Sequence, residues 1–276
     1  MYRKKGVRMT QKRSKKIVSA ITILVDADMM VYRSCASCER EIDWGDDLWT
    51  LHTDFNEALE HLQSQMDYYI QRALTLDKYS GEVNVIYAFS DDNNNFRKGL
   101  LPTYKLNRVG KRKPLAYAAL KQWVIENWVS AWIENLEADD VIGLIATGNY
   151  KGNNIIISAD KDMKTIPTKF YNFLDDTLSV VSDEEAQYNL LFQTLIGDTA
   201  DNYSGCPKVG KVKAERILND NPTWGAVVEC FKKAGQTEED ALLMARVAHI
   251  LQDGDYDFEK GTIKLWTPES LKKQKI

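Results

Sequence analysis

The sequence predicts an α/β fold with a mostly parallel sheet, followed by a helical C-terminal part. Short apolar, β-branched segments alternate with helical periodicity as far as residue 182, which is typical of parallel sheets. Beyond residue 182 the periodicity is almost entirely helical. With 276 residues, 44% of them hydrophobic, the chain is long enough for one large domain or two smaller ones.

Each predicted element rests on a local signal. Apolar residues at three- and four-residue steps indicate one or two helices in 47–77, Pro114 begins a helix, and Gly148 ends another. The predicted strands span 20–25, 82–89, 129–133, 154–158, 168–173 and 178–181. The predicted helices span 47–77, 114–127, 137–147, 183–196, 209–219, 224–233 and 238–251. We therefore divide the chain into a flexible basic tail at 1–19, an α/β core at 20–182 and a helical part at 183–276.

The charge is unevenly distributed. The tail carries eight Lys or Arg residues and no acid, which leaves 28 basic and 40 acidic residues in the rest of the chain. A cationic tail on an acidic body favours a polyanionic partner and an acidic site that binds cations, although a solvated tail without a partner is the simpler alternative.

Several classes of protein are excluded. No apolar run reaches the roughly 18 residues needed to span a bilayer, so we expect no membrane partner. The run at 17–25 follows basic residues like a signal peptide but ends at Asp26 and Asp28 without a cleavage site, which indicates a buried strand. Cys35 and Cys38 form a lone CxxC, but the other two cysteines and the three histidines do not supply the second ligand pair of a zinc site, and free thiols fit a reducing cytoplasm.

Carboxylates gather where the strongest predicted strands end. In a parallel sheet these ends share one edge, where ligands bind. Such carboxylates repel one another unless hard divalent cations lie among them, and two Mg²⁺ ions can clamp a phosphodiester. The absence of His and Cys argues against zinc. For any single Asp a helix N-cap is the alternative. The set comprises Asp26, Asp91, Glu137, Asp139, Asp140, Asp160, Asp162, Asp198 and Asp201.

Two basic segments complement these acids. Residues 93–125 contain eight basic residues and no acid, with Tyr104 and Tyr117 interleaved, which favours a surface for phosphates and stacked bases. A solvated loop is the alternative. Further on, a Gly-containing turn opens into a helix with Lys208, Lys211 and Lys213, where backbone N–H groups could hold a phosphate.

Taken in order, these motifs resemble the 5′-nuclease superfamily, which includes flap endonucleases and the 5′-nuclease domains of bacterial DNA polymerases. The chain looks most like the phage 5′→3′ exonucleases of replication and recombination. The resemblance runs from Ile23 to Pro268. Its motifs are Asp26-Ala-Asp28, Ser90-Asp91, Phe96-Arg97-Lys98, Tyr104-Lys105-Leu-Asn107-Arg108, Glu137-Ala-Asp139-Asp140, Asp160-Lys-Asp162 and Gly197-Asp198-Thr-Ala-Asp201-Asn.

The resemblance implies a PIN-like three-layer sandwich followed by a helix–turn–helix-type DNA-binding part. It implies two Mg²⁺ ions, for which Mn²⁺ can substitute. One would be held by Asp26, Asp91, Glu137 and Asp139, the other by Asp160, Asp162, Asp198 and Asp201, with Asp140 near both. Lys105, Arg108 and Arg97 would act on the scissile phosphate. The residues expected to bind DNA are Arg33, Lys98, Tyr104, Lys111, Arg112, Lys113, Lys208, Lys211 and Lys213.

The implied activity is Mg²⁺-dependent 5′→3′ exonuclease action on duplex DNA in the cytoplasm of a bacterial host. The sequence leaves open whether a replisome component is a further partner. A flap endonuclease with RNase H-like activity on RNA–DNA hybrids is the main alternative. A non-catalytic DNA-binding factor and a PIN-type ribonuclease are others. Two features depart from the superfamily pattern: Lys208-Val-Gly210 replaces a Gly-x-Gly hairpin, and the segment from Arg108 to Pro114 is short for a helical arch.

Overall fold

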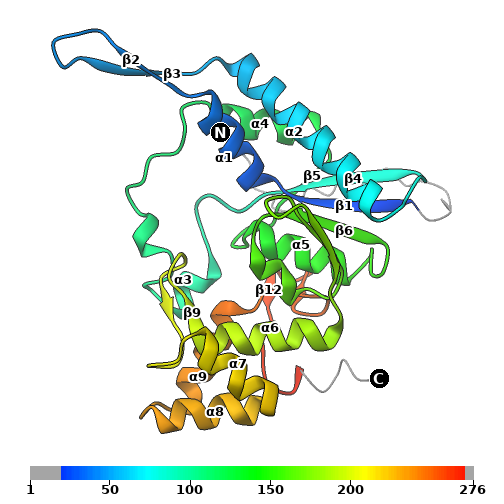
Figure 1. Cartoon of the computed structure of the whole chain (residues 1–276), viewed down its shortest axis with the longest axis vertical. Helices are drawn as coiled ribbons and strands as arrows, with labels where there is room; N and C mark the ends of the chain where they lie inside the picture. The colour runs from blue at the N-terminus through cyan, green and yellow to red at the C-terminus, as the bar shows by residue number, and fades with distance from the viewer. Residues whose placement is uncertain (1–19, 271–276) are drawn as a thin grey trace.

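A central six-stranded sheet organises the computed structural model, which describes residues 20–270 (Figure 1). The strand order is β5-β4-β1-β6-β7-β8, and every neighbouring pair is parallel except β7 and β8. The predicted α/β fold with a mostly parallel sheet is therefore confirmed, while the tail at 1–19 lies outside the described residues. The strands are β1 (Ile21–Asp26), β4 (Val83–Ala88), β5 (Ser130–Ala131), β6 (Asn154–Ser158), β7 (Lys169–Asn172) and β8 (Thr177–Val180).

Helices cover both faces of the sheet, which makes three layers. Alternate residues of β1 point to opposite faces: Ile23 and Val25 join the core beneath α1, α2 and α4, whereas Leu24 packs with α5. Because both faces are covered, β1 is buried at all six positions, as its continuous apolar sequence predicts. The helices are α1 (Ala27–Cys38), α2 (Phe55–Leu76), α4 (Tyr117–Asn127) and α5 (Ala138–Thr147).

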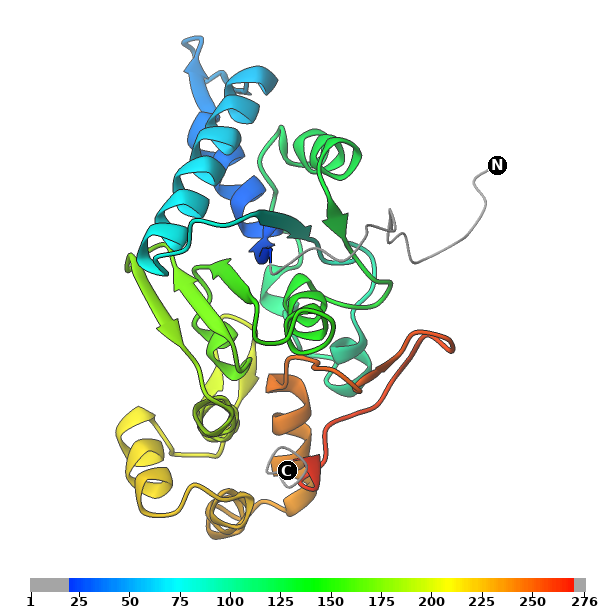
Figure 2. The ribbon, with the colours of Figure 1, turned by 90° about the vertical axis from the view of Figure 1, so that its right-hand side faces the viewer.

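The helical part has a core of its own but is interlocked with the sheet. Leu195, Leu218 and Phe231 belong to the helical core, whereas Ala186 in the first turn of α6 packs with the α5 side of the sheet. After α9 the chain turns back, and Leu251 also joins the α5 core (Figure 2). The elements are α6 (Asp183–Ile196), α7 (Lys211–Asp220), α8 (Trp224–Lys233), α9 (Glu238–Ala248), and the hairpin β11 (Tyr256–Asp257) and β12 (Thr262–Ile263).

The return of the chain depends on one glycine. A Cβ atom on Gly143 in α5 would lie 2.3 Å from the carbonyl oxygen of Leu251, so only glycine permits this contact. The predicted helix at 238–251 ends early, at Ala248, because the following residues are extended against α5.

The prediction of helix for 47–54 is wrong. Residues 40–52 form a protruding hairpin of β2 (Arg40–Asp43) and β3 (Trp49–His52), and α2 begins only after its N-cap Asp54 (Figure 1). Positive φ angles at Gly45, Asp46 and Asp47 make the turn. The sequence prediction also omitted α3 (Phe96–Leu100), the 3₁₀ turns η1 (Leu106–Arg108) and η2 (Lys161–Thr165), and the short pair β9 (Gly197–Asp198) and β10 (Tyr203–Ser204). No helix within 20–270 is both long and apolar enough to cross a bilayer.

Candidate active site

A cleft of about 520 Å³ opens at the carboxyl edge of the sheet, beside β1, β6 and the start of α5. Carboxylates form its floor and basic residues from the segment between α3 and α4 form its rim. This is the edge at which parallel α/β sheets bind ligands. Its charged or hydrogen-bonding lining includes Asp26, Asp28, Lys105, Arg108, Lys111, Arg112, Lys113, Tyr117, Glu137, Asp139 and Asp160.

One serine aligns two of the floor carboxylates. The Ser158 hydroxyl donates to Asp26 Oδ2 at 3.0 Å and accepts the backbone N–H of Asp160 at 3.0 Å. These residues meet because β1 and β6 are parallel neighbours that end together. Burial raises the pKa of Asp26 to about 7, and the negative charges of Asp28 and Asp160 add to the shift.

The neighbouring carboxylates also resist ionisation. Burial raises the pKa of Asp139 and of Asp160, and the charges of Asp26 and Asp160 raise that of Asp139 further. Burial, followed by the charge of Asp160, raises the pKa of Asp162 to about 7. The Oδ1 atom of Asp162 is buried without a hydrogen-bond partner. A hard divalent cation bound here would reduce the repulsion among these carboxylates and would give the buried oxygen a partner.

Basic side chains neutralise the carboxylates on the other side of the cleft. The Lys105 ammonium bonds to Glu137 and lies 3.4 Å from Asp201 Oδ2, and the Arg108 guanidinium also bonds to Asp201. Although burial opposes ionisation of Glu137, Lys105 and Arg97 outweigh it and lower the pKa of Glu137 to about 2.

The acidic residue Asp198 is paired with a lysine side chain. Lys161 Nζ lies 3.2 Å from Asp198 Oδ2, and the backbone N–H of Ala200 donates to Asp198 Oδ1 at 2.7 Å. These contacts outweigh burial and lower the pKa of Asp198. Within residues 20–270, no group of three or more His, Cys, Asp or Glu side chains is arranged so that it could hold a metal ion. The oxygen-only chemistry of Asp26, Asp139, Asp160 and Asp162 nevertheless fits Mg²⁺.

Two distant motifs hold Lys105 in place. Lys105 has a left-handed backbone with φ 53°, and its N–H donates to the Asp201 carbonyl at 2.8 Å. The Asn202 side chain donates to the Thr103 carbonyl at 2.7 Å, and in return the Asn107 side chain donates to the Thr199 carbonyl at 3.2 Å. The reciprocal asparagine bonds explain why a rarely populated conformation is maintained at this position.

Arg97 and Asp140, expected to act on the scissile phosphate and to lie near the metal ions, do not line the cleft. Both side chains are buried and paired to each other, with Arg97 Nη1 2.7 Å from Asp140 Oδ2 and Nη2 2.8 Å from Oδ1. The remaining Arg97 donors reach Glu137 Oε2 and the carbonyls of Val247 and His249. In this arrangement every Arg97 donor is engaged and the Asp140 carboxylate is fully enclosed, so the two residues form a buried structural pair.

Asp91 and Tyr104 also differ from expectation. The Asp91 carboxylate accepts the backbone N–H groups of Asn93 and Asn135, both at 2.9 Å, and Asp91 does not line the cleft. Its geometry is that of a turn-stabilising carboxylate, which differs from the helix N-cap expected as the alternative for a single Asp. Tyr104 is buried with its hydroxyl 2.8 Å from Glu137 Oε2, so it supports the carboxylates and is not exposed to stack on a base.

The basic residues expected to bind DNA divide into three groups. Lys111, Arg112 and Lys113 line the cleft. Lys208 and Lys213 line a groove of about 520 Å³ between α7 and α8, together with Arg216 and Lys233. The exposed residues Lys98, Lys211 and Arg33 line neither of these sites, and Arg33 lies over the Phe173 ring at 5.2 Å.

Sequence reasoning missed several residues that position the site. Asp28 accepts bonds from the Ser90 N–H at 2.6 Å and the Tyr117 hydroxyl at 2.8 Å, and pairs with Lys121 at 3.2 Å. Ser158 stands directly before the Ala-Asp160 motif, a position that could have identified it. Glu39 is too far along the sequence from its partner Arg112 for any pattern to connect them.

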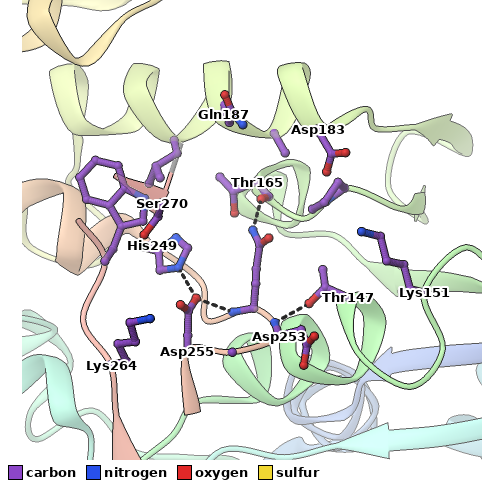
Figure 3. A pocket seen from close by; sticks show the side chains of 16 residues that line it. Thr147, Lys151, Thr165, Asp183, Gln187, His249, Asp253, Asp255, Lys264 and Ser270 are labelled. Atoms are coloured by element: carbon purple, nitrogen blue, oxygen red, sulfur yellow. Dashed lines mark hydrogen bonds and ion pairs between the residues drawn. The ribbon is translucent and has the colours of Figure 1, made fainter. Parts of the chain in front are cut away.

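A second cavity, of about 440 Å³, lies away from these acids, between α5, α6 and the returning chain (Figure 3). Some of its polar groups are paired with one another: His249 Nε2 lies 2.8 Å from Asp255 Oδ2, and the Asp253 N–H donates to Thr147 Oγ1 at 2.8 Å. These bonds fasten the returning chain to α5. None of the expected metal ligands lines this cavity.

Comparison with known proteins agrees with this geometry. Residues 21–190 match the family model "5′-3′ exonuclease, N-terminal resolvase-like domain". The chain is 29% identical to the exodeoxyribonuclease of Enterobacteria phage T3, over 90% of this chain and 93% of that protein. It is 30% identical to a 5′-3′ exonuclease of Buchnera aphidicola subsp. Baizongia pistaciae, over 67% of this chain and 71% of that protein.

Among solved structures, the fold is similar to that of T5 5′-exonuclease with divalent metal ions (zinc) bound. The TM-score is 0.55 at 17% identity, and the match covers 83% of this chain and 89% of that one. A T5 D15 flap endonuclease in a complex with DNA and metal ions matches with a TM-score of 0.54 at 16% identity, over 82% of this chain and 88% of that one. On the strength of the family match over most of its length, the chain belongs to the 5′-3′ exonuclease family and is a nuclease.

Proposed function

We propose that the chain hydrolyses phosphodiester bonds of duplex DNA from 5′ ends in the 5′→3′ direction, using two Mg²⁺ ions. The observation that carries the proposal is the set of mutually repelling carboxylates around Asp160 beneath a basic rim. Such a floor is stable with divalent cations bound, and such a rim suits a polyanionic strand. The T3 and T7 relatives, named exodeoxyribonuclease and exonuclease, support a role in phage DNA replication or recombination.

Two groups of side chains would hold the ions. Asp26, Asp139 and Asp160 supply the first, and Asp162, Asp198 and Asp201 the second; Asp160 stands between them because its charge acts on members of both groups. When bound, the ions would activate the attacking water and stabilise the leaving 3′ oxygen. That divalent ions and DNA occupy the T5 structures of similar fold supports this assignment.

The basic residues then act on the substrate. Water adds across the P–O3′ bond, so the products are a 3′-hydroxyl on the released nucleotide and a 5′-phosphate on the remaining strand. Lys105 reaches the middle of the carboxylates and would offset charge on the scissile phosphate, while the half-exposed Arg108 can turn from Asp201 toward it. The groove lined by Lys208 and Lys213 would hold the duplex backbone.

The test uses linear duplex DNA labelled at one 5′ end, with Mg²⁺ or with EDTA. We expect labelled mono- or short oligonucleotides only with Mg²⁺. Asp160→Ala should abolish this release while DNA binding persists, because binding rests on the basic rim and groove. Asp175→Ala, on the exposed loop between β7 and β8, is the matched control and should cleave normally. Absence of release with any divalent cation, with normal DNA binding, would overturn the proposal.

A further inference from the structure

We propose that Cys206 and Cys230 form a reversible oxidation site, at which a disulfide narrows the groove between α7 and α8 and weakens its hold on duplex DNA. The oxidant that fits the site is a small hydroperoxide. The groove lies in the helical part, at the opposite end of the molecule from the β2–β3 hairpin (Figure 1). Formation of the disulfide concerns the two thiols alone, whereas its effect on DNA rests on the proposed function of this groove.

The two thiols are already in contact. Cys206 lies in the turn between β10 and α7, Cys230 lies in α8, and their Sγ atoms are 3.5 Å apart. Cys206 is 3% exposed and Cys230 is 9% exposed, and Cys230 is among the residues that line the groove. The other two free thiols, Cys35 and Cys38, belong to the core beneath α1. A small oxidant that enters the groove therefore meets Cys230 before any other thiol.

The charges around the groove give the two thiols different roles. Cys230 interacts electrostatically with the ammonium of Lys233, which also lines the groove. Burial raises the pKa of Cys206 to about 12 and contact with Cys230 adds to the rise, whereas the charge of Lys213 opposes it. A cation beside a sulfur favours the thiolate that attacks an oxidant. Cys230 is therefore the attacking group, and Cys206 is the thiol that reacts second.

The reaction takes two steps. The Cys230 sulfur attacks the terminal oxygen of the hydroperoxide, the O–O bond breaks, and the alkoxide leaves with the Cys230 proton as an alcohol, or as water if the oxidant is hydrogen peroxide. Cys230 is now a sulfenic acid. The Cys206 sulfur attacks the Cys230 sulfur, an S–S bond forms, and the hydroxyl leaves with the Cys206 proton as water. The two thiols lose two electrons and two protons, and the hydroperoxide is reduced.

The turn that carries Cys206 is closely packed and cannot move to meet Cys230. A Cβ atom on Gly205 would lie 2.2 Å from the Leu195 carbonyl oxygen, and one on Gly197 would lie 2.2 Å from the Gly205 nitrogen. The Cys206 N–H also donates to the Leu195 carbonyl at 2.8 Å. Because a disulfide is about 2.05 Å long, the sulfurs must approach by about 1.5 Å. Any part of this approach that side-chain rotation does not supply falls on α8.

Movement of α8 toward the turn narrows the groove. Lys208 and Lys213 line it from the turn and α7, and Lys233 lines it from α8. These cations would hold the duplex backbone while the groove is open. Loss of one lysine–phosphate contact should weaken duplex binding about tenfold. The competing explanation is that the two cysteines only fill space in the helical core, and in that case DNA binding would not respond to an oxidant through them.

The test uses the full chain, reduced with dithiothreitol, freed of the reductant and then treated with hydrogen peroxide. We expect the intact mass to fall by two hydrogen atoms and a non-reducing peptide map to show a Cys206–Cys230 crosslink. The dissociation constant for a blunt duplex in EDTA, measured by fluorescence anisotropy, should rise about tenfold. Fresh dithiothreitol should reverse all three changes, a result that needs no variant to fold.

Two variants assign the effect. Cys230→Ala should bind duplex equally well before and after peroxide, and the matched control Cys35→Ala, which removes a buried thiol beneath α1, should respond as the native chain does. Absence of the crosslink, unchanged affinity in the crosslinked chain, or a loss of affinity that persists in Cys230→Ala would overturn the proposal. If the reduced chain neither binds duplex nor cleaves it with Mg²⁺, the proposed function fails, while the mass and the peptide map still decide whether the disulfide forms.

Discussion

Removal of the Arg97 side chain is a sharp test of the buried pair with Asp140. The Asp140 side chain is fully buried, and Arg97 supplies two of its hydrogen bonds. Arg97→Ala leaves this carboxylate with only the N–H groups of Glu137 and Leu251. Breaking a buried pair by removing one partner typically costs about 3–5 kcal/mol. For a chain of this size, 1 kcal/mol lowers the melting temperature by about 2–4 °C, so a fall of roughly 6–20 °C is expected.

A second substitution identifies the cause. Asp140→Asn, added to Arg97→Ala, keeps an oxygen for the two N–H groups but removes the negative charge. The double variant should therefore recover part of the stability lost in Arg97→Ala. Arg33→Ala is the matched control, because Arg33 is exposed and should contribute less than about 1 kcal/mol. Urea and thermal unfolding in EDTA measure all four chains. A loss below about 1 kcal/mol in Arg97→Ala, together with abolished cleavage, would mean that Arg97 acts on the substrate as the sequence suggested.

Three further predictions concern the cleft. In the folded chain Asp26 and Asp162 have pKa values of about 7, against 3.8 in the unfolded chain, so near neutral pH they hold protons that the unfolded chain has released. The free energy of unfolding in EDTA should therefore fall from pH 5 to 8. A flat profile would contradict the conclusion that these buried carboxylates resist ionisation. Ser158→Ala should weaken Mg²⁺ binding about 10–100-fold, measured by titrating the metal against cleavage rate; unchanged affinity would mean that the serine does not align the carboxylates. Asn202→Gly and Asn202→Ala should slow cleavage equally, since both release the backbone beside Lys105, while the glycine variant melts higher because residue 202 has φ 57°. Equal melting temperatures would refute the backbone argument.

Neighbouring acids in one motif show how far sequence reasoning reaches. Asp139 and Asp140 are equally good metal ligands by residue type, but successive residues of a helix point about 100° apart. The structure directs Asp139 toward Asp26 and Asp160, and Asp140 toward Arg97. That choice depends on where the end of α9 lies, more than 100 residues away along the chain, and no local pattern contains this information.

The basic segment shows the same limit. Its sequence has no acid between 93 and 125, which predicts a cationic surface or a solvated loop whose side chains have no acidic partner nearby in the sequence. In the fold, Asp201, Glu39 and Asp92 arrive from three other elements and pair with its side chains. The cations are where the sequence placed them, but their partners are set by tertiary contacts.

The α/β class, the covered sheet and the edge at which carboxylates gather could all be predicted from the sequence. These features follow from local physics. A strand buried on both faces must be continuously apolar, so polar residues can stand only after its end. Which carboxylates face the cleft, which of them are neutralised, and which basic side chains line it depend on the tertiary fold. Those outcomes depend on pairs such as Glu39 with Arg112, brought together by packing, and their energies exist only when both partners are in place.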